Sequence, residues 1–374
     1  MGTKKALLLY ISEISGHRCA SLAIEKALHT LEPGMETINI NSFNYTNPIL
    51  EKVINRTYMS VVRRKPEIWD YLYDNPEVLK KVQALRTMIH KFNTGKLKTL
   101  LDESRPDAIL CTQAFPCGMV ADYKRSFGLD VPLVGVLTDY APHSYWIYDN
   151  VDRYIVPSEE TGRKLIENGV DARKIEAFGI PIDSKFAGPI RREDACRRLG
   201  LDAGLPVILV MGGSQGLGPI KELVKLLDRS PLNFQMIAAA GSNSRLYRVL
   251  MRRSRRLRKK AVILPNASNV DELMAASSII ITKPGGITTA EALAKRLPML
   301  IVNPLPGQEA MNTKYLLKEG VAVKAENPED AVVILEELMY NRYKLERMAE
   351  KAGALARPDS SENIARLTLS LIKR

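Results

Sequence analysis

Short apolar runs alternate with longer amphipathic segments along nearly the whole chain. In the first half, the apolar run Ala6–Ile11 precedes the segment Arg18–Leu31, in which apolar residues recur at helical spacing. Further apolar runs, each long enough for one buried strand, lie at Ala108–Cys111, Leu133–Leu137 and Tyr154–Val156. Strands that alternate with helices in this way are typical of parallel sheets built from βα units.

The second half repeats the pattern. The run Val207–Met211 leads into a glycine-rich turn, after which Pro219 is well placed as the first residue of a helix. Four more strands are predicted at Phe234–Ala239, Val262–Leu264, Ile279–Ile281 and Met299–Val302. The boundary between the halves is expected near Gly179-Ile180-Pro181, because a charged stretch follows it. A chain of 374 residues is longer than one core usually supports, so the sequence predicts an α/β protein with two Rossmann-like domains, residues 1–182 and 190–358.

Composition narrows the choice of function. The chain has 54 Lys and Arg against 42 Asp and Glu, a net charge of +12, which suits binding to nucleic acid, anionic lipid or phosphorylated substrates. The four cysteines form no Cys-x-x-Cys pair, which indicates reduced thiols in a cytosolic protein. The first apolar run is too short for a signal peptide, and no apolar stretch approaches the ~20 residues that span a bilayer. Any membrane contact is therefore expected to be peripheral.

Two segments concentrate positive charge. Residues 44–98 hold eleven Lys and Arg against five Asp and Glu, together with six aromatic residues. Cations and rings together suit a membrane interface, and the alternative is a helical insertion whose aromatic side chains belong to the core. Residues 245–260 hold nine Lys and Arg and no acid. The simpler interpretation of that run is the solvated face of a helix.

The glycine-rich turn after Val207–Met211 is a candidate phosphate cradle. Its residues Gly212, Gly213, Ser214 and Gln215 precede a predicted helix whose positive end would face an anion. Glycines let backbone N–H groups approach a phosphate closely. The order of the glycines is not the G-x-G-x-x-G of dinucleotide-binding proteins, and the turn lacks the Lys-Ser/Thr of a P-loop. A plain tight turn between strand and helix is the alternative.

The stretch Lys283–Glu291, with the sequence KPGGITTAE, carries the strongest local signal. A strand is predicted to end in Lys-Pro-Gly-Gly, and a helix to begin at Thr288. With Glu291 three residues later, Thr288 could form a capping box, which would give Glu291 a purely structural role. In the functional interpretation, the helix N-terminus beside Gly285 and Gly286 binds a diphosphate, and Glu291 accepts hydrogen bonds from two ribose hydroxyls. The spacing alone leaves both interpretations open.

Gln308 and Asn312 lie in the stretch GQEAMN, after the next predicted strand. If a helix begins here, the two side chains lie four residues apart on one face. Each carboxamide both donates and accepts hydrogen bonds, which suits pairs of sugar hydroxyls. The alternative is a polar loop followed by a surface helix. Because an open sheet binds ligands at the loops that follow its strands, the two polar loops indicate one binding site.

Candidate acid–base residues follow strands in the first half. His17 occupies the turn after the first strand, and Asp139 and His143 follow the strand Leu133–Leu137. An imidazole at the start of a helix can act as a general base, although a single histidine can also be an ordinary surface residue. Polar residues at strand ends in both halves imply a site in a cleft between them. The chain contains no Asp-x-Asp, so a metal–diphosphate clamp of that kind is not expected, and helix N-termini would balance the charge of a leaving diphosphate.

Taken together, these stretches resemble glycosyltransferase family 28, and within it the monogalactosyldiacylglycerol synthases and the processive diacylglycerol glucosyltransferases of bacteria. The resemblance extends from the first strand to about Ile372. It rests on the stretches SGHRCAS, TDYAPHSYW, VDRYIVPSEET, FGIPID, GGSQG, KPGGITTAEAL and GQEAMN. A segment like 44–98 is present in this lipid branch and absent from the peptidoglycan branch.

The resemblance implies a GT-B fold, with two facing Rossmann-like domains and a cleft between them. It assigns the acceptor to residues 1–182, with a C-terminal helix at about 360–374 packing back on them, and the UDP-sugar to residues 190–358. It implies inverting transfer of glucose or galactose from UDP-glucose or UDP-galactose to the hydroxyl of diacylglycerol, without metal or cofactor. The protein would be peripheral, on the cytoplasmic side of the cell membrane. It would contact anionic lipid through residues 44–98 and bind no nucleic acid.

The resemblance also gives each candidate residue a role. His17 becomes the base that takes the proton of the acceptor hydroxyl, with Asp139 and His143 in reserve. The nucleotide would lie along Gly212, Gly213, Ser214 and Gln215, the diphosphate at the amides of Gly285 and Gly286, the ribose at Glu291, and the sugar at Gln308 and Asn312. The turn Ile14-Ser15-Gly16-His17 departs from the family, which usually has a sequence like Gly-Gly-Gly-His, so the acceptor is less defined than the donor.

Three alternatives differ in substrate or in class. A transferase of the same family could act on a polyprenyl-linked acceptor of the peptidoglycan type. A dinucleotide-dependent oxidoreductase would also have Rossmann-like halves, but the glycine order is wrong and no acid lies about 20 residues after Gly218 to bind a ribose. A non-catalytic adaptor could use residues 245–260 to bind membrane or nucleic acid. The sequence leaves open glucose or galactose, the number of sugars added and the oligomeric state.

Overall fold

The computed structural model describes residues 3–46 and 94–373. The chain divides into two compact units, one of residues 1–184, 306–308 and 359–374 and the other of residues 185–305 and 309–358. The divisions fall close to the boundaries expected from the sequence. Most of the basic and aromatic segment 44–98 lies outside the described residues, so its proposed membrane role stays a prediction.

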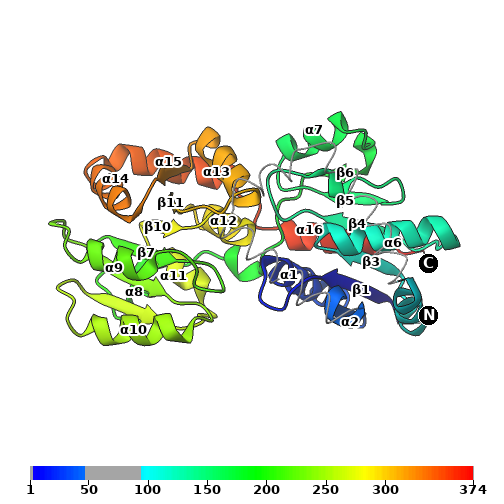
Figure 1. The fold of residues 1–374 in the computed structure, drawn as a ribbon, viewed down its shortest axis with the longest axis horizontal. Coiled ribbons are helices and arrows are strands. Elements are labelled where there is room, and N and C mark those ends of the chain that lie inside the picture. Colours follow the sequence, from blue (N-terminus) through cyan, green and yellow to red (C-terminus); the bar gives the residue numbers. More distant parts are fainter. Residues whose placement is uncertain (1–2, 47–93, 374) are drawn as a thin grey trace. The chain divides into compact units, whose positions relative to one another are not determined.

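The first unit contains a six-stranded sheet in which all strands are parallel (Figure 1). Its strands are β1 (Lys5–Tyr10), β2 (Glu36–Asn41), β3 (Ala108–Cys111), β4 (Leu133–Val136), β5 (Arg153–Ile155) and β6 (Ile175–Glu176). They are hydrogen-bonded in the order β2-β1-β3-β4-β5-β6. The order reverses between β1 and β3, which makes the ends of these two strands the switch point of the sheet.

Helices cover both faces of the first sheet, and this burial explains why its strands are apolar runs. The helices are α1 (Gly16–Leu31), α2 (Ser42–Thr46), α6 (Ala114–Phe127), α7 (Glu159–Glu167) and α16 (Ser360–Leu371), with a further helical stretch at 94–104. In β1, Leu7 and Leu9 pack into one core cluster, while Ala6 and Leu8 pack into another. Successive side chains of a strand point to opposite faces, so a strand buried on both faces is apolar throughout.

The last helix, red in Figure 1, belongs to the first unit. Ile364 and Ala365 of α16 share a core cluster with Ile24 of α1. At the start of α16, the Ser360 hydroxyl donates to the Gly179 carbonyl at 2.8 Å, and the Ser361 hydroxyl donates to the Ile182 carbonyl at 2.6 Å. Both bonds hold the returning chain at the point where the first unit ends.

The second unit contains another six-stranded sheet, again parallel throughout. Its strands are β7 (Val207–Met211), β8 (Gln235–Ala239), β9 (Ala261–Leu264), β10 (Ile279–Thr282), β11 (Met299–Val302) and β12 (Ala322–Ala325). Their order is β12-β11-β10-β7-β8-β9. This is the strand order of a Rossmann fold, with the switch point between β7 and β10.

Within the described residues, eight helices pack on this sheet, and two of them begin at other residues than the sequence predicts. They are α8 (Arg192–Arg198), α9 (Ile220–Leu227), α10 (Ser244–Ser254), α11 (Val270–Ala276), α12 (Gly286–Ala294), α13 (Gln308–Glu319), α14 (Pro328–Tyr340) and α15 (Arg342–Leu355). Pro219 is the N-cap of α9 and not its first residue. Helix α12 begins at Gly286 and not at Thr288, because Gly285 is the N-cap.

The prediction of an α/β protein with two Rossmann-like domains is confirmed by the two parallel sheets. Three strands were not predicted, namely β2, β6 and β12. Each lacks a continuous apolar run: β2 reads ETININ and is only partly buried, and β6 has two residues. Both β2 and β12 are edge strands, where one side of the strand has no neighbour to bury it.

Candidate functional site

The first group of predicted residues lies at the switch point of the first sheet. His17 is the second residue of α1, directly after the loop that follows β1. Ser15 is the N-cap of that helix: its hydroxyl accepts a hydrogen bond from the Arg18 amide at 3.3 Å and donates to the Ile11 carbonyl at 2.8 Å. The turn therefore owes its shape to a capping serine.

A single imidazole links the ends of three strands. His17 Nδ1 lies 2.8 Å from the carbonyl oxygen of Thr112, which follows β3, and 3.1 Å from Oγ1 of Thr138, which follows β4. In return, the Thr112 hydroxyl donates to the His17 carbonyl at 2.9 Å. Because a carbonyl oxygen can only accept, Nδ1 carries the proton in the neutral ring, and Nε2 is left with a free lone pair.

Burial keeps this imidazole neutral. Desolvation lowers the pKa of His17 below its ordinary value, and the negative charge of Asp139 opposes that effect in part. A histidine with a lowered pKa is largely unprotonated near neutral pH. The ring can therefore accept a proton through Nε2, while Asp139 stabilises the imidazolium that would form.

The two reserve candidates differ from His17 in what they can do. Burial, together with the nearby His17, lowers the pKa of His143 to about 4, which makes its imidazole a weaker base than an ordinary histidine. The His143 ring makes an edge contact with Tyr145, with ring centroids 5.2 Å apart, so it is part of a packed aromatic group. Asp139 is partly buried and acts on the charge of His17. The geometry thus favours His17 over His143 as a base and gives Asp139 a supporting position.

The glycine-rich turn of the second unit is tightly folded at the end of β7. A Cβ on Gly212 would lie 1.8 Å from the Leu217 carbonyl oxygen, and one on Gly216 would lie 1.9 Å from that of Ala240. These two positions require glycine because the backbone passes close to them. Gly213 is different: its φ is +68°, yet no atom lies within 4 Å of where its Cβ would be. The turn is compact beneath and open over Gly213, next to the exposed Ser214 and Gln215.

The start of α12 has the features of an anion site. Gly285 caps the helix without a side-chain hydrogen bond, and a Cβ on Gly285 would again meet nothing within 4 Å. Backbone N–H groups at such a helix start have no partner within the helix and attract an anion. The capping box is contradicted, since Thr288 lies inside the helix and is not the cap. The partly buried Glu291 therefore has no capping role and stays a candidate for the ribose.

The predicted pair on α13 divides between surface and interior. Gln308 is the first residue of α13 and is partly exposed, whereas Asn312 has no exposed surface. Asn312 Nδ2 donates to the Pro284 carbonyl at 3.0 Å. The sequence placed both side chains on one polar face, but the structure turns Asn312 inward, where it holds the turn before α12. A direct contact of Asn312 with a sugar is therefore less well supported than that of Gln308.

An ion pair missed by the sequence analysis joins the same two loops. Lys283 Nζ lies 2.7 Å from Glu309 Oε1, and the two side chains are only 11% and 17% exposed. The other oxygen of Glu309 accepts the Leu305 amide at 2.7 Å. The Lys283 side chain also lies beside Gly218, whose Cβ would be 3.9 Å from it. The turns after β7 and β10 and the start of α13 are thus neighbours at the switch point of the second sheet.

A second residue that the sequence analysis passed over is Thr289. Its side chain is 1% exposed, and its hydroxyl has no hydrogen-bond partner among the described residues. It lies in the first turns of α12, between Thr288 and the predicted ribose residue Glu291. Buried hydroxyls are normally hydrogen-bonded, so the Thr289 hydroxyl adds an unsatisfied polar group to the start of α12.

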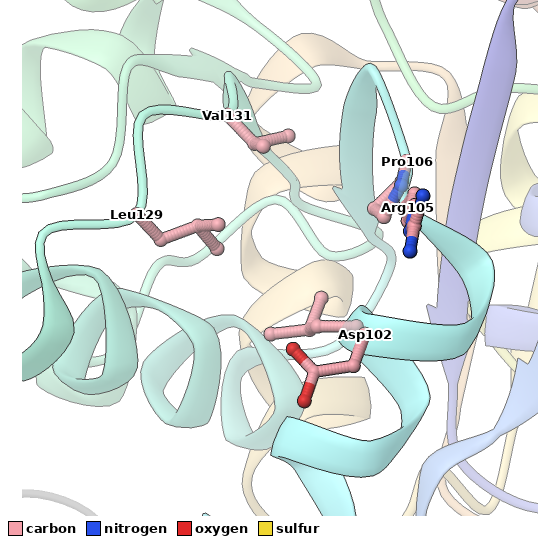
Figure 2. A pocket seen from close by; sticks show the side chains of 6 residues that line it. Asp102, Arg105, Pro106, Leu129 and Val131 are labelled. Carbon is pink, nitrogen blue, oxygen red and sulfur yellow. The ribbon is translucent and has the colours of Figure 1, made fainter.

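A surface pocket of the first unit lies away from these residues (Figure 2). It is lined by Leu101, Asp102, Arg105, Pro106, Leu129 and Val131. Arg105 and Pro106 precede β3, so the pocket is at the N-terminal end of that strand. Open parallel sheets bind ligands at the opposite ends of their strands. The pocket is therefore separate from the candidate site around His17.

The described residues contain neither a metal-binding group of side chains nor a membrane-spanning helix. Within residues 3–46 and 94–373, no three or more His, Cys, Asp or Glu side chains are grouped so that they could hold a metal ion. In the same part of the chain, no helix has the length and apolar character needed to cross a bilayer.

Comparisons with known proteins agree with this division of the chain. The family described as monogalactosyldiacylglycerol (MGDG) synthase matches residues 17–182, and the family described as glycosyltransferase family 28 C-terminal domain matches residues 207–364. A processive diacylglycerol beta-glucosyltransferase of Bacillus mycoides is 29% identical over 96% of this chain and 92% of its own. The protein of that name from Bacillus cytotoxicus is 29% identical over 98% of this chain and 93% of its own.

Among solved structures, MurG of Acinetobacter baumannii is similar in fold. Its TM-score is 0.62 at 15% identity, and the match covers 98% of this chain and 99% of that one. At this identity the similarity concerns the fold alone. The match covers both units, each with its parallel sheet.

Proposed function

Because this chain belongs to glycosyltransferase family 28, in the branch of the monogalactosyldiacylglycerol synthases and processive diacylglycerol glucosyltransferases, we propose that it transfers glucose from UDP-glucose to the hydroxyl of diacylglycerol. It is a UDP-sugar-dependent glycosyltransferase with the GT-B fold. The product would be a glycolipid with the configuration at the anomeric carbon inverted.

The observation that carries this proposal is the similarity along the whole chain. The relatives named diacylglycerol glucosyltransferases align with 96% and 98% of the sequence, and the MGDG synthase match lies in the first unit. A likeness confined to the second unit would leave the acceptor undefined. Since the likeness includes the first unit, it supports a lipid acceptor as well as a nucleotide-sugar donor.

The second unit, together with Gln308 of the first, would hold the donor. The backbone amide of Gly286 and the positive end of α12 would meet the diphosphate beside Gly285, whose own amide donates to the Lys283 carbonyl at 2.9 Å. The open backbone at Gly213 would lie along the nucleotide. Glu291 would accept hydrogen bonds from the ribose, and Gln308 would contact the sugar. Lys283 is paired with Glu309, so its charge is largely balanced within the protein. The attraction for the diphosphate would therefore come from the amides.

The first unit would supply the base. In the proposed step, His17 Nε2 accepts the proton of the acceptor hydroxyl while the oxygen of that hydroxyl forms a bond to C1 of glucose. The bond from C1 to the β-phosphate oxygen breaks on the opposite face, its electron pair leaves with UDP, and C1 inverts. The geometry at Nδ1 supports this role, because the Thr112 carbonyl at 2.8 Å fixes the tautomer that leaves Nε2 free to accept.

The choices of glucose, of diacylglycerol and of a metal-free step are parts of the proposal. Glucose is preferred to galactose because the aligned relatives carry glucosyltransferase names, although the first-unit match is to MGDG synthase. A polyprenyl-linked acceptor of the peptidoglycan type, the alternative within the same family, is the second candidate. The charge of leaving UDP is assigned to backbone amides, without a metal.

Membrane contact and location complete the proposal. Diacylglycerol resides in a bilayer, so the protein would act as a peripheral protein on the cytoplasmic side of the cell membrane. Residues 44–98 would contact anionic lipid there, as their charge and aromatic content indicate. Neutralising Arg63, Arg64 and Lys65 together, all outside the described residues, would test that segment by vesicle binding at low salt.

One experiment tests the proposed reaction. The purified full chain is incubated with UDP-glucose or UDP-galactose and with vesicles containing diacylglycerol or a polyprenyl-linked acceptor, and lipid products are identified by mass spectrometry. We expect glucosyl-diacylglycerol, unchanged in yield when EDTA is added. Transfer to the polyprenyl-linked lipid alone would establish the second candidate. Preference for UDP-galactose would overturn the sugar, and loss of activity with EDTA would overturn the metal-free step.

A further inference from the structure

A continuous basic surface lies on the second unit, outside the predicted nucleotide site. It is formed by α10 and the turn after it, residues 245–260, which hold nine Lys and Arg and no acid. Seven of the nine are exposed. These seven, which we call the α10 surface, are Arg245, Arg248, Arg252, Arg255, Arg256, Arg258 and Lys260. In Figure 1, α10 lies at the lower edge of the second unit, and it contacts α9.

Helical spacing gathers the central cations on one face. Arg245, Arg248, Arg252 and Arg255 follow each other at intervals of three or four residues, so their side chains are neighbours. Leu250 is fully buried in the core of the unit and anchors the helix from the other side. The four guanidinium groups are thus held near one another by a helix whose position the core fixes. Like charges at this spacing destabilise a helix, so the face is not explained by the stability of the helix itself.

The α10 surface has no acidic partners within the described residues. None of its seven cations forms an ion pair there, whereas exposed arginines elsewhere do, as in Arg347–Glu350 and Arg366–Glu362. A buried acid, Asp228, lies against the turn, and its carboxylate accepts the backbone N–H groups of Arg258 and Lys259 at 2.7 and 3.0 Å. That acid shapes the turn and leaves the cationic side chains facing solvent.

Two of the nine cations are excluded from the surface for structural reasons. Lys259 is partly buried, donates to the Leu232 carbonyl and lies over the Phe234 ring, with its Nζ 4.4 Å from the centroid. Arg253 is also partly buried. The neighbouring helix α9 and the turn after it add exposed Lys221, Lys225 and Arg229 and one exposed acid, Glu222, so the positive excess extends beyond α10.

We propose that the α10 surface binds the headgroups of anionic lipids and gives the second unit its own contact with the membrane. A dense group of unpaired cations complements a polyanion. Met251, which is 40% exposed, lies among these cations, and an apolar side chain surrounded by cations suits a bilayer interface. Single-stranded nucleic acid would need exposed rings for base stacking, but Tyr247, the aromatic residue of α10, packs on the core.

This inference goes beyond the proposed function, because it concerns the unit assigned to the donor and requires no transfer chemistry. A protein that draws its acceptor from a bilayer would gain residence time there from contacts in both units. Each surface cation strengthens binding to anionic lipid about five-fold at low salt. Three cations would then change the partition coefficient roughly 100-fold, an effect that salt should reduce.

The test compares three variants of the full chain by co-sedimentation with vesicles of phosphatidylcholine, with and without an equal part of phosphatidylglycerol. Arg248→Gln/Arg252→Gln/Arg255→Gln removes three cations of the α10 surface and leaves the Arg258 turn intact. Arg248→Lys/Arg252→Lys/Arg255→Lys keeps their charge. The matched control, Arg191→Gln/Arg197→Gln/Arg347→Gln, removes three exposed cations of the same unit that are paired with acids.

We expect the glutamine variant to lose roughly 100-fold in binding to the anionic vesicles at low salt, and the lysine variant and the control to stay close to the wild type. Unchanged binding of the glutamine variant, or an equal loss in the control, would overturn the proposal. So would retained vesicle binding with lost binding of a single-stranded oligonucleotide, which would identify nucleic acid as the partner. Transfer to a short-chain soluble acceptor, measured in parallel, reports separately on the proposed function.

Discussion

The two sheets differ in what lies at their switch points. In the first sheet, between β1 and β3, the titratable ring of His17 links the strand ends. In the second sheet, between β7 and β10, glycines and backbone amides lie at the corresponding place. His17 is hydrogen-bonded to Thr112 and lies beside Thr138. Gly213 and Gly285 leave open space above the backbone. The same parallel architecture thus presents a proton acceptor in one unit and donors for an anion in the other.

The supporting contacts differ in the same way. In the first unit, the hydrogen bonds fix which nitrogen of an imidazole carries the proton. In the second, the Lys283–Glu309 ion pair and the Asn312–Pro284 hydrogen bond fix the path of a backbone turn. The comparison supports the proposed division of labour, with proton transfer assigned to the first unit and nucleotide binding to the second. Each variant below should affect one function and leave the other intact.

The largest expected effect is that of His17→Ala on turnover. A positioned base typically contributes 10²–10⁴-fold, so we expect kcat to fall at least ~100-fold while the Kd for UDP barely changes. His17→Gln should lose as much, since a carboxamide is no base. His29→Ala is the matched control, because His29 is on the same helix, is exposed and contacts Thr37. Near-normal kcat in His17→Ala would move the base to Asp139 or His143, and lost UDP binding would assign His17 to the donor.

The next effect concerns the donor residue Glu291. A hydrogen bond to a charged group contributes about 1.5–3 kcal/mol, so Glu291→Gln should raise the KM for the UDP-sugar roughly 10- to 100-fold. Its Tm should change little, because α12 begins at Gly286 and Glu291 is not in the position of a capping-box partner. Steady-state kinetics at varied donor concentration and a thermal melt of the same sample check both parts. A fall in Tm with unchanged KM would restore a structural role for Glu291.

The Lys283–Glu309 ion pair is expected to affect UDP binding less and the free energy of unfolding more. Lys283→Met leaves Glu309 poorly solvated and unpaired, which should cost about 3 kcal/mol of unfolding free energy and weaken UDP binding about 10-fold as the turn shifts. Lys283→Met/Glu309→Gln should recover most of both, measured by denaturant unfolding and UDP titration. If the double variant regains stability but still binds UDP weakly, then the lysine itself contacts the diphosphate, contrary to the assignment to amides.

The smallest effect is expected for Thr138→Val, which keeps the shape of the side chain and removes the hydroxyl 3.1 Å from His17 Nδ1. The Thr112 carbonyl still fixes the tautomer, so kcat should fall only about five-fold, in line with the ~1 kcal/mol of an ordinary hydrogen bond. The donor KM should not change. A loss as large as that of His17→Ala would mean that Thr138, and not Thr112, holds the imidazole in place.

The sequence was sufficient for much of the fold because burial on both faces makes strands such as β1 and β7 visible as apolar runs. It did not predict β2, whose alternating and partly buried residues leave no such run. The start of α12 was misplaced because Thr288 and Glu291 match a capping box, whereas the chain uses the backbone of Gly285 as the cap. Local spacing cannot show which of two overlapping starts the tertiary structure selects.

For the candidate site, the sequence located the loops but not the direction of every side chain. Asn312 was expected beside Gln308 on a sugar-facing surface and is instead buried against Pro284. Its direction depends on how α13 packs on the turn after β10, and Lys283 and Glu309, which fix that packing, are 26 residues apart. Contacts over such separations leave no periodic signal in the sequence. The link from His17 to Thr112 is hidden for the same reason.

The division of labour is tested most directly by measuring kcat/KM on a soluble acceptor and the Kd for UDP across the same pH range. Burial lowers the pKa of His17, so the neutral base is present at and above neutral pH and is lost as the pH falls through that lowered pKa. Because the unfolded state binds this proton more readily, stability also declines at low pH, and only pH values at which the protein stays folded are used. We predict that kcat/KM falls as the pH is lowered, with a midpoint below the pKa of an ordinary histidine. The Kd for UDP should not change over the same pH range. A Kd for UDP that changes with the same midpoint, or a fall in kcat/KM that persists in His17→Gln, would contradict the account.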